Sequence, residues 1–202
     1  MADTATAKPT TRMTAGERAG IPPRRMDFNF ADDTKRYWYA DNAFLTTFWT
    51  TLSALFPAGE TFFIDSVKNY RHQVTESKLK DEISGFIGQE AMHTKEHQAF
   101  NDMGDKHGLP TLQLDKELWW LLDLAKKVFP KKMQLATTVA LEHYTAILAE
   151  QLLRDKQHQE TFKTLKHYSF GCGTPLKKMN TKPLLTMFMN SQVEGISLVC
   201  LP

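Results

Sequence analysis

The stretch 85-GFIGQEAMHTKEHQAF-100 has residue types and a spacing that suit metal binding. It places Glu90, His93 and His97 three and four residues apart, and this spacing brings side chains to one face of a helix. The same face carries Leu79, Ile83, Phe86 and Phe100, whereas the opposite face carries Lys80, Glu82, Gln89, Lys95 and Glu96. We therefore expect Glu90 and His93 to point into a core, and the opposite face to be exposed.

Two further glutamates interrupt apolar helical faces in the same way. The face of Glu60 is otherwise formed by Phe56, Phe63, Val67, Tyr70 and Val74, and that of Glu142 by Leu135, Val139, Ala146, Ala149 and Leu153. A buried carboxylate without a partner loses its charge through a raised pKa. Several of them on core faces therefore predict a common cationic partner, and a pair of divalent metal ions would offset their charge. Imidazole combined with carboxylate favours Fe, Mn or Zn over Ca or Mg.

Each of these residues also has a simpler interpretation. Glu60 alone could be a first-turn glutamate favoured by the helix dipole, and Glu142 could face a polar gap. His97 is more typical of a satisfied core histidine, or of one that orients a ligand, than of a direct ligand. His143 lies one step off the buried face. Taken together, the predicted metal ligands are Glu60, Glu90, His93 and Glu142, and His97 is predicted to assist proton transfer.

The elements that must position these residues are all predicted to be helices. The predicted ranges are Asn42–Phe56, Gly59–Val74, Thr75–Met103, Leu112–Val128 and Pro130–Arg154, with a further helix from about Gln159. Pro57 and Gly59 are expected to separate the first two, and Thr75 or Ser77 to cap the third. No strand-like alternation of any length is present, so the sequence predicts an all-α fold.

The order of the candidate ligands along these helices is also informative. Four-helix dimetal proteins take a single Glu from each of two helices and a Glu-x-x-His from each of the other two. Here the helices of Glu60 and Glu142 each contribute one glutamate, and Glu90 and His93 form a Glu-x-x-His motif. A second Glu-x-x-His is expected after about residue 160, and the sequence has none there.

Composition limits the class of protein and its organisation. The 202 residues suit one domain, and a net charge of +2, with basic residues interleaved among acidic ones, argues against nucleic-acid binding. The sequence has no apolar run long enough for a transmembrane helix and no apolar core of a secretory signal, so we expect a cytoplasmic location. Two cysteines form no disulfide framework. The predicted organisation is a disordered segment (1–24), a helical metal-binding domain (25–167) and a tail (168–202).

Four motifs resemble a bacterial family, the predicted metal-dependent hydrolases. They are 24-RRMDFNF-30, 57-PAGETFF-63, 89-QEAMHTKEH-97 and 141-LEHYTA-146, and the likeness covers roughly residues 24–167. The resemblance implies a ferritin-like helical fold with a metal site, in which Glu60, Glu90, His93 and Glu142 match the acidic and histidine pattern of the family. Hydrolysis is implied by the family name and not by the spacing of these residues.

The segment after His167 loses helical periodicity, and its alternative translation indicates a cause. Codons permitted for 170-FGCGTPLKKMNTKPLLTMFMN-190, read from the third base of the first codon, encode WVWHSTEENEHKAVAYDVYE. This contains the W-H-x-x-E-E-x-E-H-K motif with which the family continues, including the missing Glu-x-x-His. Met179 followed by Asn180 can encode only Glu in that frame. We therefore predict a frameshift within residues 165–170, and an out-of-frame, poorly ordered tail after it.

Three functions remain open on these observations. The first is a metal-dependent hydrolase acting on a small molecule, with reduced activity in the chain as written. The second is a di-iron oxidase or oxygenase of the ferritin-like type. The third is a non-catalytic helical remnant. Without its last ligand-bearing helix the bundle would also expose an apolar groove, through which the protein could self-associate.

Overall fold

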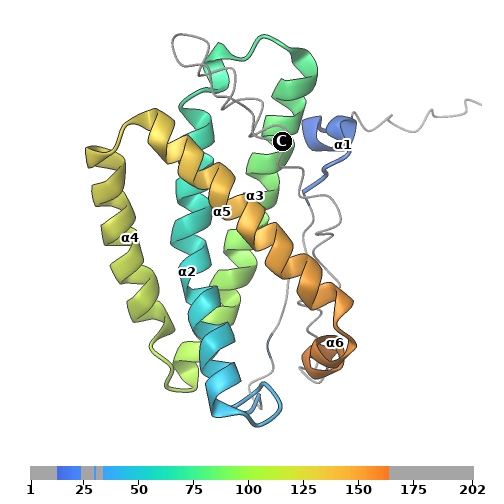
Figure 1. Cartoon of the computed structure of the whole chain (residues 1–202), viewed down its shortest axis with the longest axis vertical. Helices are drawn as coiled ribbons and strands as arrows, with labels where there is room; N and C mark the ends of the chain where they lie inside the picture. Colours follow the sequence, from blue (N-terminus) through green and yellow to red (C-terminus); the bar gives the residue numbers. More distant parts are fainter. Residues whose placement is uncertain (1–12, 24–29, 31–33, 164–202) are drawn as a thin grey trace, which may run out of the picture.

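The protein is described by a computed structural model that covers residues 13–23, 30 and 34–163. Within these residues the secondary structure is helical and contains no strand, which confirms the predicted all-α class. The elements are α1 (Ala15–Ala19), α2 (Ala43–Lys68), the 3₁₀ turn η1 (Arg71–Gln73), α3 (Ser77–Lys106), α4 (Thr111–Val128), α5 (Lys131–Arg154) and α6 (Lys156–Lys163). Helices α2 and α3 lie side by side, α4 runs along α2, and α5 crosses them obliquely (Figure 1).

Helix α2 is continuous, although the sequence predicts two helices separated at Pro57. Pro57 lies inside α2, where it is fully buried. A proline has no backbone N–H, so it leaves the carbonyl oxygen four residues earlier without its helical partner. That oxygen belongs to Ser53, and it accepts a hydrogen bond of 3.3 Å from the side-chain amide Nδ2 of Asn101 on α3. The neighbouring helix thus replaces the bond that Pro57 removes, and α2 can continue through it.

We expect Pro57 and Asn101 to act as a coupled pair. Asn101→Ala should lower the free energy of unfolding by about 1–3 kcal/mol, because it leaves the buried Ser53 carbonyl oxygen unpaired. In a Pro57→Ala background the loss should be smaller, since the restored N–H can bond to that oxygen. Urea denaturation of the four proteins in this double-mutant cycle measures the coupling, which we expect to be about 1 kcal/mol. Equal losses in both backgrounds would contradict the pairing.

Two apolar clusters hold α2, α3 and α5 together. The first is formed by Phe62, Phe63, Val67, Tyr70, Leu79, Ile83, Phe86 and Leu135. The second, toward the start of α2 and the end of α3, is formed by Trp38, Tyr39, Trp49, Phe100 and Met103. Along α2, Glu60 falls between the two clusters, and along α3, Glu90 to His97 fall between them. The candidate ligands therefore occupy a polar layer with apolar packing above and below it.

The segment before residue 24, predicted to be disordered, contains helix α1. Thr14 caps this helix, and the side chain of Glu17 bonds back to the Thr14 backbone N–H at 2.7 Å, which completes a capping box. The segment packs on a second face of α3, where a Cβ atom added to Gly85 would lie 2.5 Å from Ile21. Arg18 binds Asp81 of α3 through two hydrogen bonds of 2.6 and 2.7 Å. The capping box of α1 and its close contact with α3 at Gly85 therefore stabilise an ordered structure in part of this polar segment, which is rich in Thr and Ala.

Helix α2 ends at Lys68, six residues before the predicted end at Val74, and the 3₁₀ turn η1 follows it. The remaining helix boundaries agree with the predicted ones to within a few residues, but the predicted cap of α3 is wrong. The residue before this helix is Glu76, and it makes no side-chain capping bond. Helix α3 runs past Gly104 to Lys106, and Gly108 with a φ of 75° turns the chain toward α4. The last predicted helix begins three residues earlier than expected, as α6. The predicted tail from residue 168 and most of the motif 24-RRMDFNF-30 lie outside the described residues.

Helices α4 and α5 carry large apolar side chains on exposed positions. They are Trp120, Leu121, Leu124 and Val128 on α4, and Met133, Leu141, Tyr144 and Ile147 on α5. The predicted self-association through an apolar groove would use such residues, and it stays a prediction. Among the described helices, none combines the length and apolar character needed to cross a membrane.

Candidate metal centre

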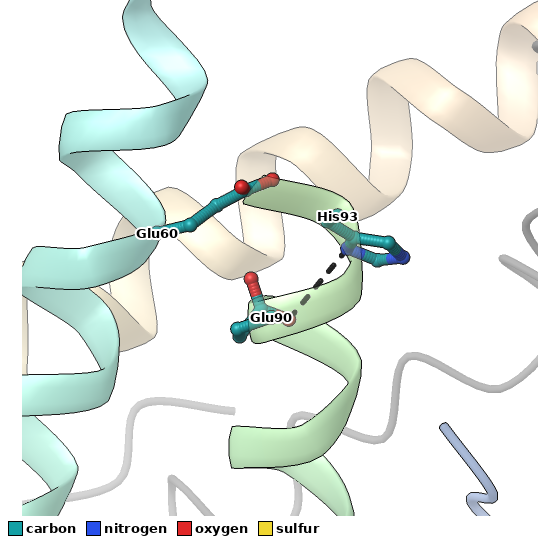
Figure 2. A group of neighbouring side chains, drawn as sticks. All are labelled: Glu60, Glu90 and His93. Atoms are coloured by element: carbon teal, nitrogen blue, oxygen red, sulfur yellow. Dashed lines mark ion pairs between the residues drawn. The ribbon is translucent and has the colours of Figure 1, made fainter. Parts of the chain in front are cut away.

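Glu60, Glu90 and His93 form the closest group of candidate ligands. One ligand atom from each lies within 4.8 Å of the corresponding atoms of the other two. Figure 2 shows Glu60 reaching from α2 toward α3, which carries both Glu90 and His93. Both glutamates are almost completely buried, at 3% exposure. The structure therefore brings together three of the four predicted ligands from two helices.

Glu142, the fourth predicted ligand, is delivered by α5. It is 3% exposed, and it lies near enough to Glu60 and Glu90 that its charge, when it is ionised, raises the pKa of both. It does not belong to the closest group of three. Two contacts fix α5 against α2 before Glu142: Leu135, two helical turns earlier, lies in the apolar cluster, and Thr138, one turn earlier, shares a 2.7 Å hydrogen bond with Ser66. His143, its neighbour, which the sequence places one step off the buried face, is exposed.

His97 lies on the Glu60 side of the centre. Its Nε2 atom is 3.9 Å from Oε1 of Glu60, and its Nδ1 atom is 2.9 Å from the hydroxyl oxygen of Ser53. The ring stacks on Phe56, with 4.3 Å between ring centroids and 7° between ring planes. Sequence reasoning missed Ser53, because the predicted break at Pro57 assigned Ser53 and Glu60 to different helices. In a continuous helix their spacing of seven residues places them on one face.

Burial dominates the electrostatics of the carboxyl groups. It raises the pKa of Glu60 and of Glu90 well above the usual range, and the charge of Glu142 raises both further. A hydrogen bond from Thr94 partly offsets the effect on Glu60. Burial also raises the pKa of Glu142 to about 8. In the absence of a cation, these three groups therefore resist ionisation near neutral pH.

The two histidines are shifted in the opposite direction. Burial lowers the pKa of His93 to about 4. Burial also lowers the pKa of His97, and repulsion from a protonated His93 lowers it further, to about 3. The contact of 3.9 Å between His93 Nδ1 and Glu90 Oε1, dashed in Figure 2, therefore joins two groups that both favour their neutral forms. It contributes little as an ion pair in the metal-free protein. Neutral imidazole is the form that binds metal ions.

The donor set fits a divalent metal ion. Oε2 of Glu60 is buried and has no hydrogen-bond partner among the described residues, so a ligand-binding oxygen lies in the interior without a compensating contact. Metal–ligand bonds of about 2.0–2.2 Å allow two ligands of one ion to lie up to about 4.4 Å apart. The 3.9 Å contacts satisfy this limit, and the 4.8 Å spread of the group of three requires only small side-chain rotations.

One predicted surface residue is placed differently. The helical spacing predicts Glu96 on the exposed face of α3, but Glu96 is buried, at 8% exposure. Helix α3 is therefore covered on a second face as well. The segment from Met13 to Pro23 contacts α3 at Gly85 and Gly88, and Glu96 follows Gly85 by three helical turns on that same face.

The fold and the site define an all-α protein with a buried cluster of glutamate and histidine suited to a divalent metal ion. Residues 22–170 match the family described as predicted metal-dependent hydrolase. The chain therefore belongs to this family, as the resemblance of its motifs implied. Comparisons with curated proteins and with solved structures give no match.

Proposed function

We propose that this protein is a metal-dependent hydrolase whose metal centre is formed by Glu60, Glu90, His93 and Glu142. The observation that carries the proposal is the convergence of three buried carboxyl groups and an imidazole at the point where α2, α3 and α5 meet. Membership of a family described as predicted metal-dependent hydrolases supports the reaction class. The substrate is proposed to be a small molecule with a hydrolysable ester, amide or phosphoester bond.

Each residue has a stated part in this proposal. Glu60, Glu90 and Glu142 supply carboxylate oxygens, and His93 supplies a neutral imidazole nitrogen. A divalent ion bound there would supply Lewis acidity, which polarises a carbonyl or phosphoryl oxygen and activates water. The apolar clusters on either side lower the polarity around the buried carboxyl groups, which strengthens electrostatic interactions there, whereas the His93 side chain is 24% exposed and leaves the centre open to water on its side. The role in proton transfer that the sequence predicts for His97 stays a prediction. The contacts of His97 with Ser53 and Glu60 favour a role as a metal ligand.

Metal content and hydrolysis can be measured on the same samples. We expect the purified chain to retain divalent metal, and to cleave p-nitrophenyl esters or phosphoesters in a reaction that a chelator stops and added metal restores. Glu90→Gln should reduce cleavage to the rate of the metal-free protein, because it removes a ligand. Glu117→Gln, at an exposed position of α4, is the matched control and should change neither property.

Other outcomes of this experiment would favour the other two functions. Coloured, iron-loaded protein that consumes O₂ without cleaving these substrates would favour a di-iron oxidase or oxygenase of the ferritin-like type. A chain that binds no metal, and whose stability is unchanged by Glu90→Ala, would favour a non-catalytic helical remnant.

The finer features of the sequence interpretation belong to the same proposal. We propose a ferritin-like bundle whose last ligand-bearing helix is encoded in another reading frame, so that this chain is less active than a frame-restored one. The end of the family match at residue 170, beside the predicted frameshift, supports this interpretation. Resequencing the gene tests it directly. A single uninterrupted frame that encodes only the present tail would rule it out.

A further inference from the structure

Three side chains of α2 converge on the imidazole of His97. Ser53 contacts Nδ1 at 2.9 Å, Phe56 stacks against the ring, and Glu60 faces Nε2 at 3.9 Å. Their spacings of three and four residues place all three on one face of the helix. The ring is therefore held in one orientation, with one nitrogen occupied by Ser53 and the other directed at a buried carboxyl group.

The distance between His97 and Glu60 is compatible with two ligands of one metal ion. Two ligands of one ion with bonds of about 2.0–2.2 Å lie up to about 4.4 Å apart, and the Nε2–Oε1 distance of 3.9 Å satisfies this limit. Oε2 of the same Glu60 side chain is buried without a hydrogen-bond partner among the described residues. The hydrogen bond to Ser53 corresponds to the contact that metal-binding histidines make through their second nitrogen, which fixes the tautomer and orients the ring.

A second, similar pair lies on the other side of the centre. His93 Nδ1 and Glu90 Oε1 are also 3.9 Å apart. Glu142, also buried, lies near enough to act electrostatically on the carboxyl group of each pair. The described part of the chain thus holds two imidazole–carboxylate pairs and a third buried carboxyl group near them.

We propose that His97 and Glu60 form a second metal position beside the one at Glu90 and His93, with the Glu60 carboxylate shared between the two positions and Ser53 as a positioning residue. In this position Nδ1–H of His97 donates to the Ser53 hydroxyl oxygen, and the lone pair of Nε2 faces the ion. The inference rests on the proposed metal centre, and it assigns His97 as a ligand in place of the proton-transfer role predicted from the sequence. It also makes the second position independent of any residue after Lys163.

Metal titration of the full chain tests this assignment. The metal-free protein is titrated with Mn²⁺ or Zn²⁺ by calorimetry, and bound metal is counted by elemental analysis. We expect two equivalents for the unmodified chain and one for His97→Gln. Ser53→Ala should weaken binding of the second equivalent by about 10–100-fold, the usual effect of removing a residue that orients a ligand. His143→Gln, at an exposed position beside Glu142, is the matched control and should retain two equivalents.

The outcomes separate failure of this inference from failure of the proposed function. No metal bound by the unmodified chain would reject the metal centre as a whole. A single equivalent, or two equivalents that His97→Gln binds with unchanged affinity, would reject only the second position. If circular dichroism shows that His97→Gln is unfolded, crystals of the unmodified chain grown with Mn²⁺ decide the question. Anomalous density within about 2.0–2.3 Å of His97 Nε2 is expected, and density only beside His93 would overturn the assignment.

Discussion

Replacing Glu142 by glutamine is expected to make the metal-free protein more stable at pH 8.5 and to abolish most of its stabilisation by metal. Folding raises the pKa of this carboxyl from 4.5 to about 8 by burial, so ionising it in the folded state is unfavourable. The isosteric amide removes that ionisation. The free energy of unfolding of the metal-free protein should therefore increase, by at most about 5 kcal/mol at pH 8.5 and by little near pH 5. Chemical denaturation in chelator, and again with saturating metal, measures both effects.

The matched control for this experiment is Glu150→Gln, an exposed glutamate two turns further along α5. Its carboxylate pairs with Arg154 on the surface, at 2.6 Å, and such pairs contribute little to stability. We expect its stability to stay within about 0.5 kcal/mol of the unmodified chain at both pH values. If Glu142→Gln destabilised the metal-free protein at pH 8.5, or left its metal stabilisation intact, Glu142 would not be a buried carboxyl of the centre.

The pH dependence of stability should have opposite signs in the metal-free and metal-bound proteins. The folded state of the metal-free protein binds more protons than the unfolded state between pH 4.5 and 8, because the pKa of Glu142 is raised, so stability falls as pH rises. From pH 6.5 to 8.5, Glu142 alone should lower the free energy of unfolding by about 2 kcal/mol. Metal ligands must be deprotonated to bind, so metal-bound stability should rise with pH over the same range.

The histidines determine the acidic limit of this behaviour. Burial lowers the pKa of His93 to about 4 and that of His97 to about 3, below the value of 6.5 in the unfolded chain. The unfolded state therefore binds more protons than the folded state in this range, and the free energy of unfolding decreases as pH falls below 6.5. Denaturation in chelator at half-unit pH steps should therefore show a maximum between pH 4.5 and 6.5. A metal-free protein whose stability increased steadily from pH 6.5 to 8.5 would show that the carboxyl groups ionise without penalty, contrary to their burial.

Much of the centre follows from periodicity alone. Glu60, Glu90 and Glu142 each stand on a helical face that is mostly apolar, and the structure buries all three. A charged residue on such a face is informative because its burial is unfavourable unless something compensates for it. The pattern therefore predicts three helices whose buried faces each carry a carboxyl group.

What periodicity could not predict depends on contacts between helices. Pro57 is a strong local signal for a helix boundary, and it is overridden because Asn101, 44 residues further along the chain, bonds to the carbonyl oxygen that the proline leaves free. The partnership of Ser53 with His97 was hidden by the same misplaced boundary. Helix α1 depends on close contact at Gly85 of α3, which composition does not reveal.

The oblique crossing of α5 over α2 and α3 has a consequence for the order in which the centre is assembled (Figure 1). Helices α2 and α3 are joined by a short connection, so their pairing requires little loop-closure entropy and can bring Glu60, Glu90 and His97 together first. Glu142 arrives only when α5 docks, and docking is therefore the step that confines all three carboxyl groups. A cation present during folding would favour that last step selectively. The metal would then act as a folding cofactor of α5, and not only as a component of the finished site.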